Sequence, residues 1–180
     1  MHGRGVAVAC ALAAVFAAGC SSGDKPVALP SISPSSSPSA SPSPTGATTE
    51  LAAVSAVVRQ WFSLLGSSTS ISTAASIESI TTSKCKCRNA SRSIRDAVAK
   101  SERYVGTSKI TNLTPAMDGA TAAEVLVEYN YSDGGLTARD GHYISRVAGR
   151  KHVEANFRLR LVNGRWVIAE IDSIHEGTAA

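Results

Sequence analysis

Residues 152–174 read HVEANFRLRLVNGRWVIAEIDSI, and this stretch decides the fold. Before the Asn163-Gly164 pair, every second position is apolar: Val153, Ala155, Phe157, Leu159 and Leu161. A period of two is typical of a strand that buries one face. Asn-Gly is a preferred pair for a two-residue hairpin turn of type I′, so we expect residues 165–174 to return beside the first strand.

Alternation predicts further strands earlier in the chain. Residues 125–131 place Val125, Val127 and Tyr129 on one face, and the Ser-Asp-Gly-Gly run at 132–135 predicts a turn. Another strand is predicted around 141–147, and it turns into the strand at 152–162. Together these segments predict an antiparallel meander.

Helical spacing dominates the sequence before Gly106. One apolar stripe consists of Leu51, Val54, Val58, Trp61 and Leu65. The threonines at 48–49 can cap this helix, and Gly66 can end it. Shorter stripes predict a second helix over 74–82 and a third over 89–105 that stops at Gly106. Three helices followed by a meander predict an α+β domain, with the helices packed on the concave face of a curved sheet.

The first 19 residues have the pattern of a signal peptide. Their apolar run, 6–18, spans about 20 Å as a helix, less than a hydrocarbon core of about 30 Å. The small residues before Cys20 resemble the bacterial lipobox, although Ala17 stands where that motif usually has leucine. This resemblance implies that the Cys20 thiol receives diacylglycerol and that the new amine is acylated, for example with palmitate. The alternative is an ordinary secretory signal cleaved near Ala18.

The chain divides into three parts of different composition. Residues 1–19 are the expected lipoprotein signal peptide. Residues 20–47 begin with the lipidated cysteine and continue as a Ser/Pro-rich tether, whose composition predicts an extended, disordered linker. Residues 48–180 are the single α+β domain, about 130 residues, enough for one core.

The charge of the domain is mildly positive. The whole chain carries +4; without Arg4 and the cancelling pair Asp24 and Lys25, +3 remains on the domain. The basic residues are spread over helices and strands with few aromatic neighbours, which argues against nucleic-acid binding. Weak attraction to anionic lipid headgroups is the expected consequence.

The order of elements resembles the nuclear transport factor 2-like (SnoaL-like) fold. The residues that carry this resemblance are the NGRWVIAEID run at 163–172, which follows three expected helices. The lipobox, the tether, Trp61-Phe62 in the first helix, and cysteines beside Arg88-Asn89 also resemble an actinobacterial lipoprotein family of unknown function with that fold. The family has its cysteines as C-x-x-C, whereas this chain has Cys85-Lys86-Cys87. The resemblance implies a helix-lined cone and an extracytoplasmic lipoprotein.

Cys85 and Cys87 are the sharpest local chemical feature. Three alternatives remain open: a tight and therefore labile disulfide, free or redox-active thiols, and capture of a soft metal such as Cu(I). The neighbouring Lys84, Lys86 and Arg88 would lower the thiol pKa and favour reactivity.

A cone-shaped interior is the expected binding pocket, and its candidate lining residues are Trp61, Tyr104, Tyr129, Phe157 and Trp166. Catalytic relatives of the fold use acidic residues, tyrosine or histidine there. The candidates here, Tyr104, Tyr129, Glu128, Glu170, Asp172 and Arg158, form no recognisable spacing. His142 and His152 are expected on adjacent strands but as exposed polar residues more than as metal ligands, and His175 is expected in a frayed tail.

These observations favour a non-catalytic, lipid-anchored binding or accessory module on the extracytoplasmic face of the cell membrane, without cofactor or metal. Its expected partners are the membrane, through the anchor, and an envelope protein or a small apolar ligand. A homodimer is also compatible with the fold. The alternatives are a pocket enzyme of isomerase or hydrolase type and a thiol redox or Cu(I)-binding protein acting through Cys85 and Cys87.

Overall fold

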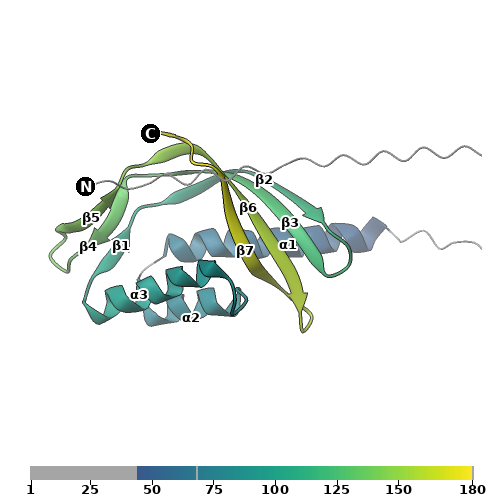
Figure 1. Cartoon of the computed structure of the whole chain (residues 1–180), viewed down its shortest axis with the longest axis horizontal. Coiled ribbons are helices and arrows are strands. Elements are labelled where there is room, and N and C mark those ends of the chain that lie inside the picture. The colour runs from purple at the N-terminus through teal and green to yellow at the C-terminus, as the bar shows by residue number, and fades with distance from the viewer. Residues whose placement is uncertain (1–43, 68, 180) are drawn as a thin grey trace, which may run out of the picture. The chain divides into compact units, whose positions relative to one another are not determined.

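A computed structural model describes residues 44–67 and 69–179. Within these ranges, three α-helices precede two antiparallel sheets (Figure 1). The expected signal peptide, Cys20 and most of the expected tether lie outside the described residues. Over the described part of the chain, no helix combines the length and apolar character needed to cross a bilayer.

The first two helices are α1, Pro44–Leu65, and α2, Ile71–Ser79. Helix α1 begins before the predicted threonine cap, since a proline suits the first turn of a helix. Helix α2 is shifted from the predicted 74–82, because the side chain of Ser70 caps it by accepting from the backbone N–H of Thr73 at 3.1 Å. It ends early because the backbone at 80–82 exchanges hydrogen bonds with Ile168 instead.

Helix α3, Asn89–Ala99, follows a 3₁₀ turn, η1, Lys86–Arg88. The prediction that it continues to residue 105 is wrong. The backbone N–H of Glu102 bonds the Ala97 carbonyl, and that of Ser101 bonds the Val98 carbonyl. With Ser101 at φ 59°, this is a Schellman ending. Glycine is the usual residue at such a position, so the serine in the sequence did not indicate that the helix ends there.

The large sheet has the strand order β2-β3-β6-β7. Its strands are β2, Ser108–Met117; β3, Ala122–Tyr131; β6, Arg150–Val162; and β7, Arg165–His175, with the short β8, Thr178–Ala179, paired to β6. The predicted hairpin at Asn163-Gly164 is confirmed. Strand β2 was not predicted because Pro115 interrupts its pattern; proline is tolerated there since β2 is an edge strand.

The small sheet has the order β1-β4-β5. Its strands are β1, Arg103–Val105; β4, Gly134–Thr137; and β5, Tyr143–Val147. The predicted turn at 132–135 is therefore partly strand. A Cβ on Gly134 would collide with the Val105 carbonyl, so glycine is what lets β1 and β4 approach so closely.

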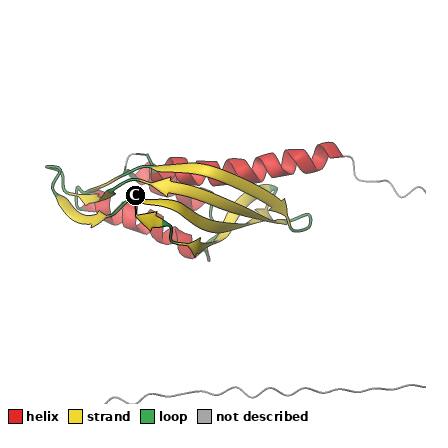
Figure 2. Cartoon of the chain, turned by 90° about the horizontal axis from the view of Figure 1, so that it is seen from above, coloured by secondary structure: helices red, strands yellow, loops and turns green. Residues whose placement is uncertain are grey.

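The core lies between the helices and the inner face of the large sheet. Figure 1 shows this sheet curving over the helices, with the small sheet at one end, and Figure 2 shows the strands layered over them. The alternating residues predicted to face inward do so; the buried set from β3 and β6 is Ala123, Val125, Val127, Val153, Ala155, Phe157 and Leu159. Apart from Val153, they form one cluster with Val54, Val58, Trp61 and Phe62 of α1.

Candidate functional site

A cavity lies at the end of the molecule where the small sheet meets the helices. Its volume is about 460 Å³. Helix α1 contributes its last residues, α3 contributes its first two turns, and β1, β4 and β5 form the opposite wall. The lining residues are Leu64, Leu65, Ser67, Thr69, Thr73, Ala90, Ser93, Ile94, Tyr104, Val105, Gly106, Thr107, Ser108, Tyr131, Ser132, Gly134, Gly135, Leu136, Ser145 and Val147.

The lining of this cavity is aliphatic with a border of hydroxyl groups. Its ionisable side chains are two tyrosines, Tyr104 and Tyr131, and its other polar side chains are serines and threonines. A concave, mostly apolar surface with a few hydroxyls suits an uncharged or aliphatic ligand. Several of the apolar residues around it, including Leu65, Tyr104 and Val147, are more than a third exposed. The cavity is therefore reachable from solvent.

Of the five residues predicted to line a pocket, only Tyr104 lines this cavity. The other four fill the interior of the cone, which corrects the prediction. Trp61, Phe157 and Trp166 are buried in the core, and Tyr129 packs against it. An inward-facing aromatic residue has the same spacing whether it lines a void or fills one, so the sequence could not separate the two.

Tyr129 shows how tightly the interior is filled. Its ring stands edge-on to Phe62 with centroids 4.8 Å apart, and Phe62 in turn contacts Phe157 at 5.8 Å. Burial raises the pKa of the Tyr129 phenol, and the neighbouring Tyr131 raises it further. Tyr129 therefore keeps its proton at neutral pH and acts as a packing residue.

A second, smaller cavity of about 300 Å³ adjoins the first. Both cavities are lined by Thr69, whose side-chain oxygen accepts a hydrogen bond from the backbone N–H of Tyr104 at 2.8 Å. The other residues of the second cavity are Val98, Ser101, Glu102, Arg103 and Arg139. In contrast to the first cavity, this one carries charged groups.

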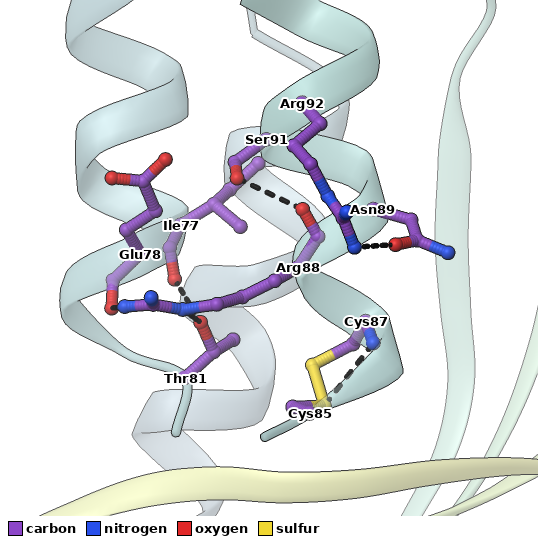
Figure 3. Close-up of a disulfide and its surroundings, with 9 residues drawn as sticks. All are labelled: Ile77, Glu78, Thr81, Cys85, Cys87, Arg88, Asn89, Ser91 and Arg92. Atoms are coloured by element: carbon purple, nitrogen blue, oxygen red, sulfur yellow. Dashed lines mark hydrogen bonds between the residues drawn. A yellow bond between two sulfur atoms is a disulfide. The ribbon is translucent and has the colours of Figure 1, made fainter. Parts of the chain in front are cut away.

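The cysteines predicted as a chemical site lie elsewhere, before α3 (Figure 3). Cys85 and Cys87 are joined by a disulfide. Cys85 is 4% exposed, and its sulfur accepts a hydrogen bond from the Cys87 backbone N–H at 3.2 Å. Neither sulfur is a thiolate in this arrangement, and neither lines the two cavities.

The predicted histidine pair is not brought together. Strand β5 pairs with β4, whereas β6 pairs with β3 and β7, so His142 and His152 are not on adjacent strands. His152 instead lies 2.7 Å from Glu128. His175 is not in a frayed tail but ends strand β7. Among the described residues, no group of three His, Cys, Asp or Glu side chains could hold a metal ion.

The charged candidates from the strands form an exposed cluster on the large sheet. The Arg158 guanidinium lies 3.3 Å from Glu124, 2.8 Å from Glu170 and 3.3 Å from Asp172. The hydrogen bond to Glu170 is the main cause that raises the pKa of Arg158, with Asp172 next. All four side chains are about half exposed, so this cluster is a solvated network on the sheet and not part of either cavity.

The sequence contained one indication of the first cavity. A glycine pair inside a strand segment, here Gly134-Gly135, often marks close approach of a neighbouring backbone. The sequence interpretation assigned this pair to a turn. The remaining lining residues come from eight helices and strands and from three loops, and no local spacing relates them.

No protein-family model matches the chain, and no curated protein matches it. Among solved structures it is similar to the intermembrane space region of the chloroplast protein ARC6, with a TM-score of 0.50 and 12% identity over 69% of this chain and 96% of that chain. It is also similar to the Kfla4162 protein from Kribbella flavida, with a TM-score of 0.52 and 10% identity over 71% and 90% of the two chains.

At sequence identities this low, the similarity supports a conclusion about the fold alone. Three helices precede and cover a curved antiparallel sheet, with the core between the two layers. The predicted α+β class, with three N-terminal helices packed on a curved antiparallel sheet, is confirmed.

Proposed function

We propose that this protein is a non-catalytic binding module of the cell envelope, anchored by lipid at Cys20, which holds a small apolar ligand in the cavity between α1, α3 and the small sheet. The observation that carries the proposal is the lining of that cavity, aliphatic walls bordered by hydroxyl groups. Its volume of about 460 Å³ lies within the range of about 300–1,000 Å³ that is common for small-molecule sites.

The chemistry of the lining supports binding over turnover. General acid–base catalysis needs a group whose pKa lies near the working pH. The ionisable side chains of the cavity are Tyr104 and Tyr131, and among the described residues no carboxylate, imidazole or amine side chain lines it. The charged cluster around Arg158 and the Glu128–His152 pair are on the sheet, outside the cavity.

The anchor and the tether complete the proposal. A cysteine acylated at position 20 would hold the chain to the membrane, and the Ser/Pro-rich segment after it would let the domain reach partners at a distance. The same reasoning proposes the extracytoplasmic face of the cell membrane as the location. Apolar ligands are available at that location, because lipids and other envelope components carry apolar groups.

The cavity is tested by filling it. Ala90 lines the cavity from α3, whereas Ala99 is an exposed residue of the same helix outside it. The protein used is the full chain with Cys20→Ala, so that no acyl group or detergent competes. We expect this protein to bind the apolar fluorophore N-phenylnaphthylamine, Ala90→Phe to abolish most of the fluorescence increase, and Ala99→Phe to leave it intact.

Overpacking at Ala90 can cost about 1–3 kcal/mol of stability, so thermal unfolding of each variant is followed by circular dichroism in parallel. Binding that survives Ala90→Phe in a folded protein would place the probe elsewhere and overturn the proposal. An absence of probe binding in the parent chain would do the same.

A further inference from the structure

The two cavities at this end of the molecule are neighbours with opposite character. Thr69 belongs to the lining of both, and Arg103 of the second cavity directly precedes Tyr104 of the first. One side is aliphatic and the other is polar and charged. A ligand that occupies both must therefore have an apolar body and a polar end.

The charged side of this pair is cationic overall. Its ionisable residues are Glu102, Arg103 and Arg139, which leaves one net positive charge. Within the described residues, neither arginine side chain takes part in an ion pair or a hydrogen bond. Both are exposed. By contrast, Arg88, Arg95 and Arg158 are engaged with protein acceptors.

Two guanidinium groups without a protein partner favour an anionic ligand group. Guanidinium presents N–H donors in a planar fork that matches a carboxylate or phosphate. Arg103 belongs to β1, and Arg139 belongs to the turn between β4 and β5. Both arginines are therefore part of the small sheet and its connecting turn, and this sheet also forms one wall of the apolar cavity.

We propose that the joined cavities bind a long-chain carboxylate, with the aliphatic chain between α3 and the small sheet and the carboxylate at Arg103 and Arg139. This inference rests on the proposed function and names its ligand class. Glu102 sits at the same end and opposes the anion, so it lowers affinity and favours ligands that reach both arginines. The hydroxyl group of Thr69 lies between the two ends of the site.

The ligand series separates the two ends of the site. Binding to the full chain with Cys20→Ala is measured by displacement of N-phenylnaphthylamine and by calorimetry. The probes are decanoate, decanol and decyltrimethylammonium, which share the chain and differ in the charge of the head group. We expect decanoate to bind at least about tenfold more tightly than the other two probes, because one charge-assisted hydrogen bond increases the affinity by about that factor. Octanoate and dodecanoate should differ by about fourfold in affinity for each methylene group.

The variants test the residues. Arg103→Gln and Arg139→Gln should each lower the affinity for decanoate by about tenfold. Both should leave the affinity for decanol unchanged. The matched controls are Arg160→Gln and Arg165→Gln, exposed arginines of β6 and β7 outside both cavities. These should bind decanoate like the parent. Glu102→Gln should strengthen decanoate binding, because it removes the opposing charge.

The outcomes distinguish this inference from the proposed function. If decanol and decanoate bind equally, and neither arginine variant discriminates between them, the carboxylate site is overturned while the apolar cavity stands. If none of the probes binds, both are overturned. Preference for decyltrimethylammonium would show that Glu102 dominates the site, which also contradicts the inference.

Discussion

At the scale of single residues, Arg88 shows how the start of α3 is held to α2. Its Nη2 donates to the Glu78 carbonyl at 2.8 Å, and its Nε donates to the Thr81 hydroxyl at 3.3 Å. The Arg88 carbonyl in turn accepts from the Ser91 hydroxyl at 2.9 Å. Figure 3 shows these groups above the Cys85–Cys87 disulfide. The side chain of Arg88 is thus committed to structure and not to a ligand.

The disulfide beside Arg88 closes a very short loop, which predicts its contribution to stability. Chain-entropy reasoning gives about 1–2 kcal/mol for a loop of about three residues, less than for a long-range bridge. We expect the Cys85→Ser, Cys87→Ser double variant to lower the unfolding free energy by that amount, measured by urea denaturation. The parent chain treated with a dithiol reductant is the control, and it should behave like the variant.

Mass spectrometry before and after reduction checks the oxidation state directly. Formation of the disulfide removes two hydrogen atoms, so the parent should gain them on reduction. Freely titrating thiols at both Cys85 and Cys87 in the folded, unreduced protein would contradict the disulfide and leave the free-thiol or Cu(I) alternatives.

At the scale of elements, α2 and α3 are joined by a two-pronged ion pair. Both guanidinium prongs of Arg95 reach the Glu78 carboxylate, Nε to Oε1 at 3.2 Å and Nη2 to Oε2 at 3.1 Å. The nearby Ser91 hydroxyl and then the hydrogen-bonded Arg95 guanidinium hold the pKa of Glu78 below its ordinary value. All these donors come from α3, so the ionised form of Glu78 favours the docked helix pair.

The lowered pKa of Glu78 predicts a pH-dependent contribution to stability. A group whose folded pKa is depressed stabilises the protein above its unfolded pKa, and the stabilisation is lost as the pH falls through the folded pKa. We expect Glu78→Gln to lower the melting temperature at neutral pH. The difference from the parent should shrink below about pH 4, the ordinary range of glutamate.

Glu154 provides the matched control for this experiment. It lies on β6, and no ion pair of the described residues involves it. Glu154→Gln should therefore leave the pH profile of the melting temperature close to that of the parent. Equal profiles for Glu78→Gln and Glu154→Gln would show that the α2–α3 ion pair does not stabilise the fold.

At the scale of the whole molecule, the large sheet and the helices enclose a filled core, and the two cavities lie at one end. Trp166 illustrates the closure, since its indole N–H donates to the Glu50 carboxylate of α1 at 2.7 Å and ties β7 to that helix. The cavities open where β1, β4 and β5 extend past this core. The proposed ligand site therefore borders the core, with which it shares Ile94.

The proposed location of the molecule depends on Cys20, which lies outside the described residues. Two or more acyl chains give stable membrane anchoring, because each buried methylene contributes about 0.8 kcal/mol. We expect Cys20→Ala to move the protein from the membrane fraction to the soluble fraction and to abolish the mass increase of acylation. Cys10→Ala is the matched control, since Cys10 lies within the expected signal peptide. Unchanged fractionation of Cys20→Ala would contradict the anchor.

Much of the fold could be predicted from local pattern, and the errors lie where distant contacts overrule it. Val125, Val127 and Phe157 were assigned to the buried face because alternation is a local property of a strand. The end of α2 was misplaced because residues 80–82 hydrogen-bond to Ile168, far along the chain. The end of α3 was missed because Ser101 takes a conformation that usually belongs to glycine.

The candidate site was less predictable than the fold. Tyr104 was the one predicted pocket residue that lines a cavity, and its companions Trp61, Phe157 and Trp166 fill the core instead. Arg103 and Arg139 were not singled out, because nothing in their local sequence distinguishes them from the other scattered arginines. Only the pairing of β1 with β4 brings Arg103 near the β4–β5 turn that carries Arg139.

By itself, the sequence determined the order of three helices before antiparallel strands, the inward faces of β3 and β6, and the hairpin at Asn163-Gly164. These follow from period and turn chemistry, which act between neighbours in the chain. The predicted meander was wrong in one respect, because β5 pairs with β4 in the small sheet and not with β6. The tertiary structure alone decided that the cone is filled and that the open space lies at the small sheet. Whether a space is empty or filled depends on how side chains from many segments fit together, and that fit is a property of their packing and not of any one stretch of sequence.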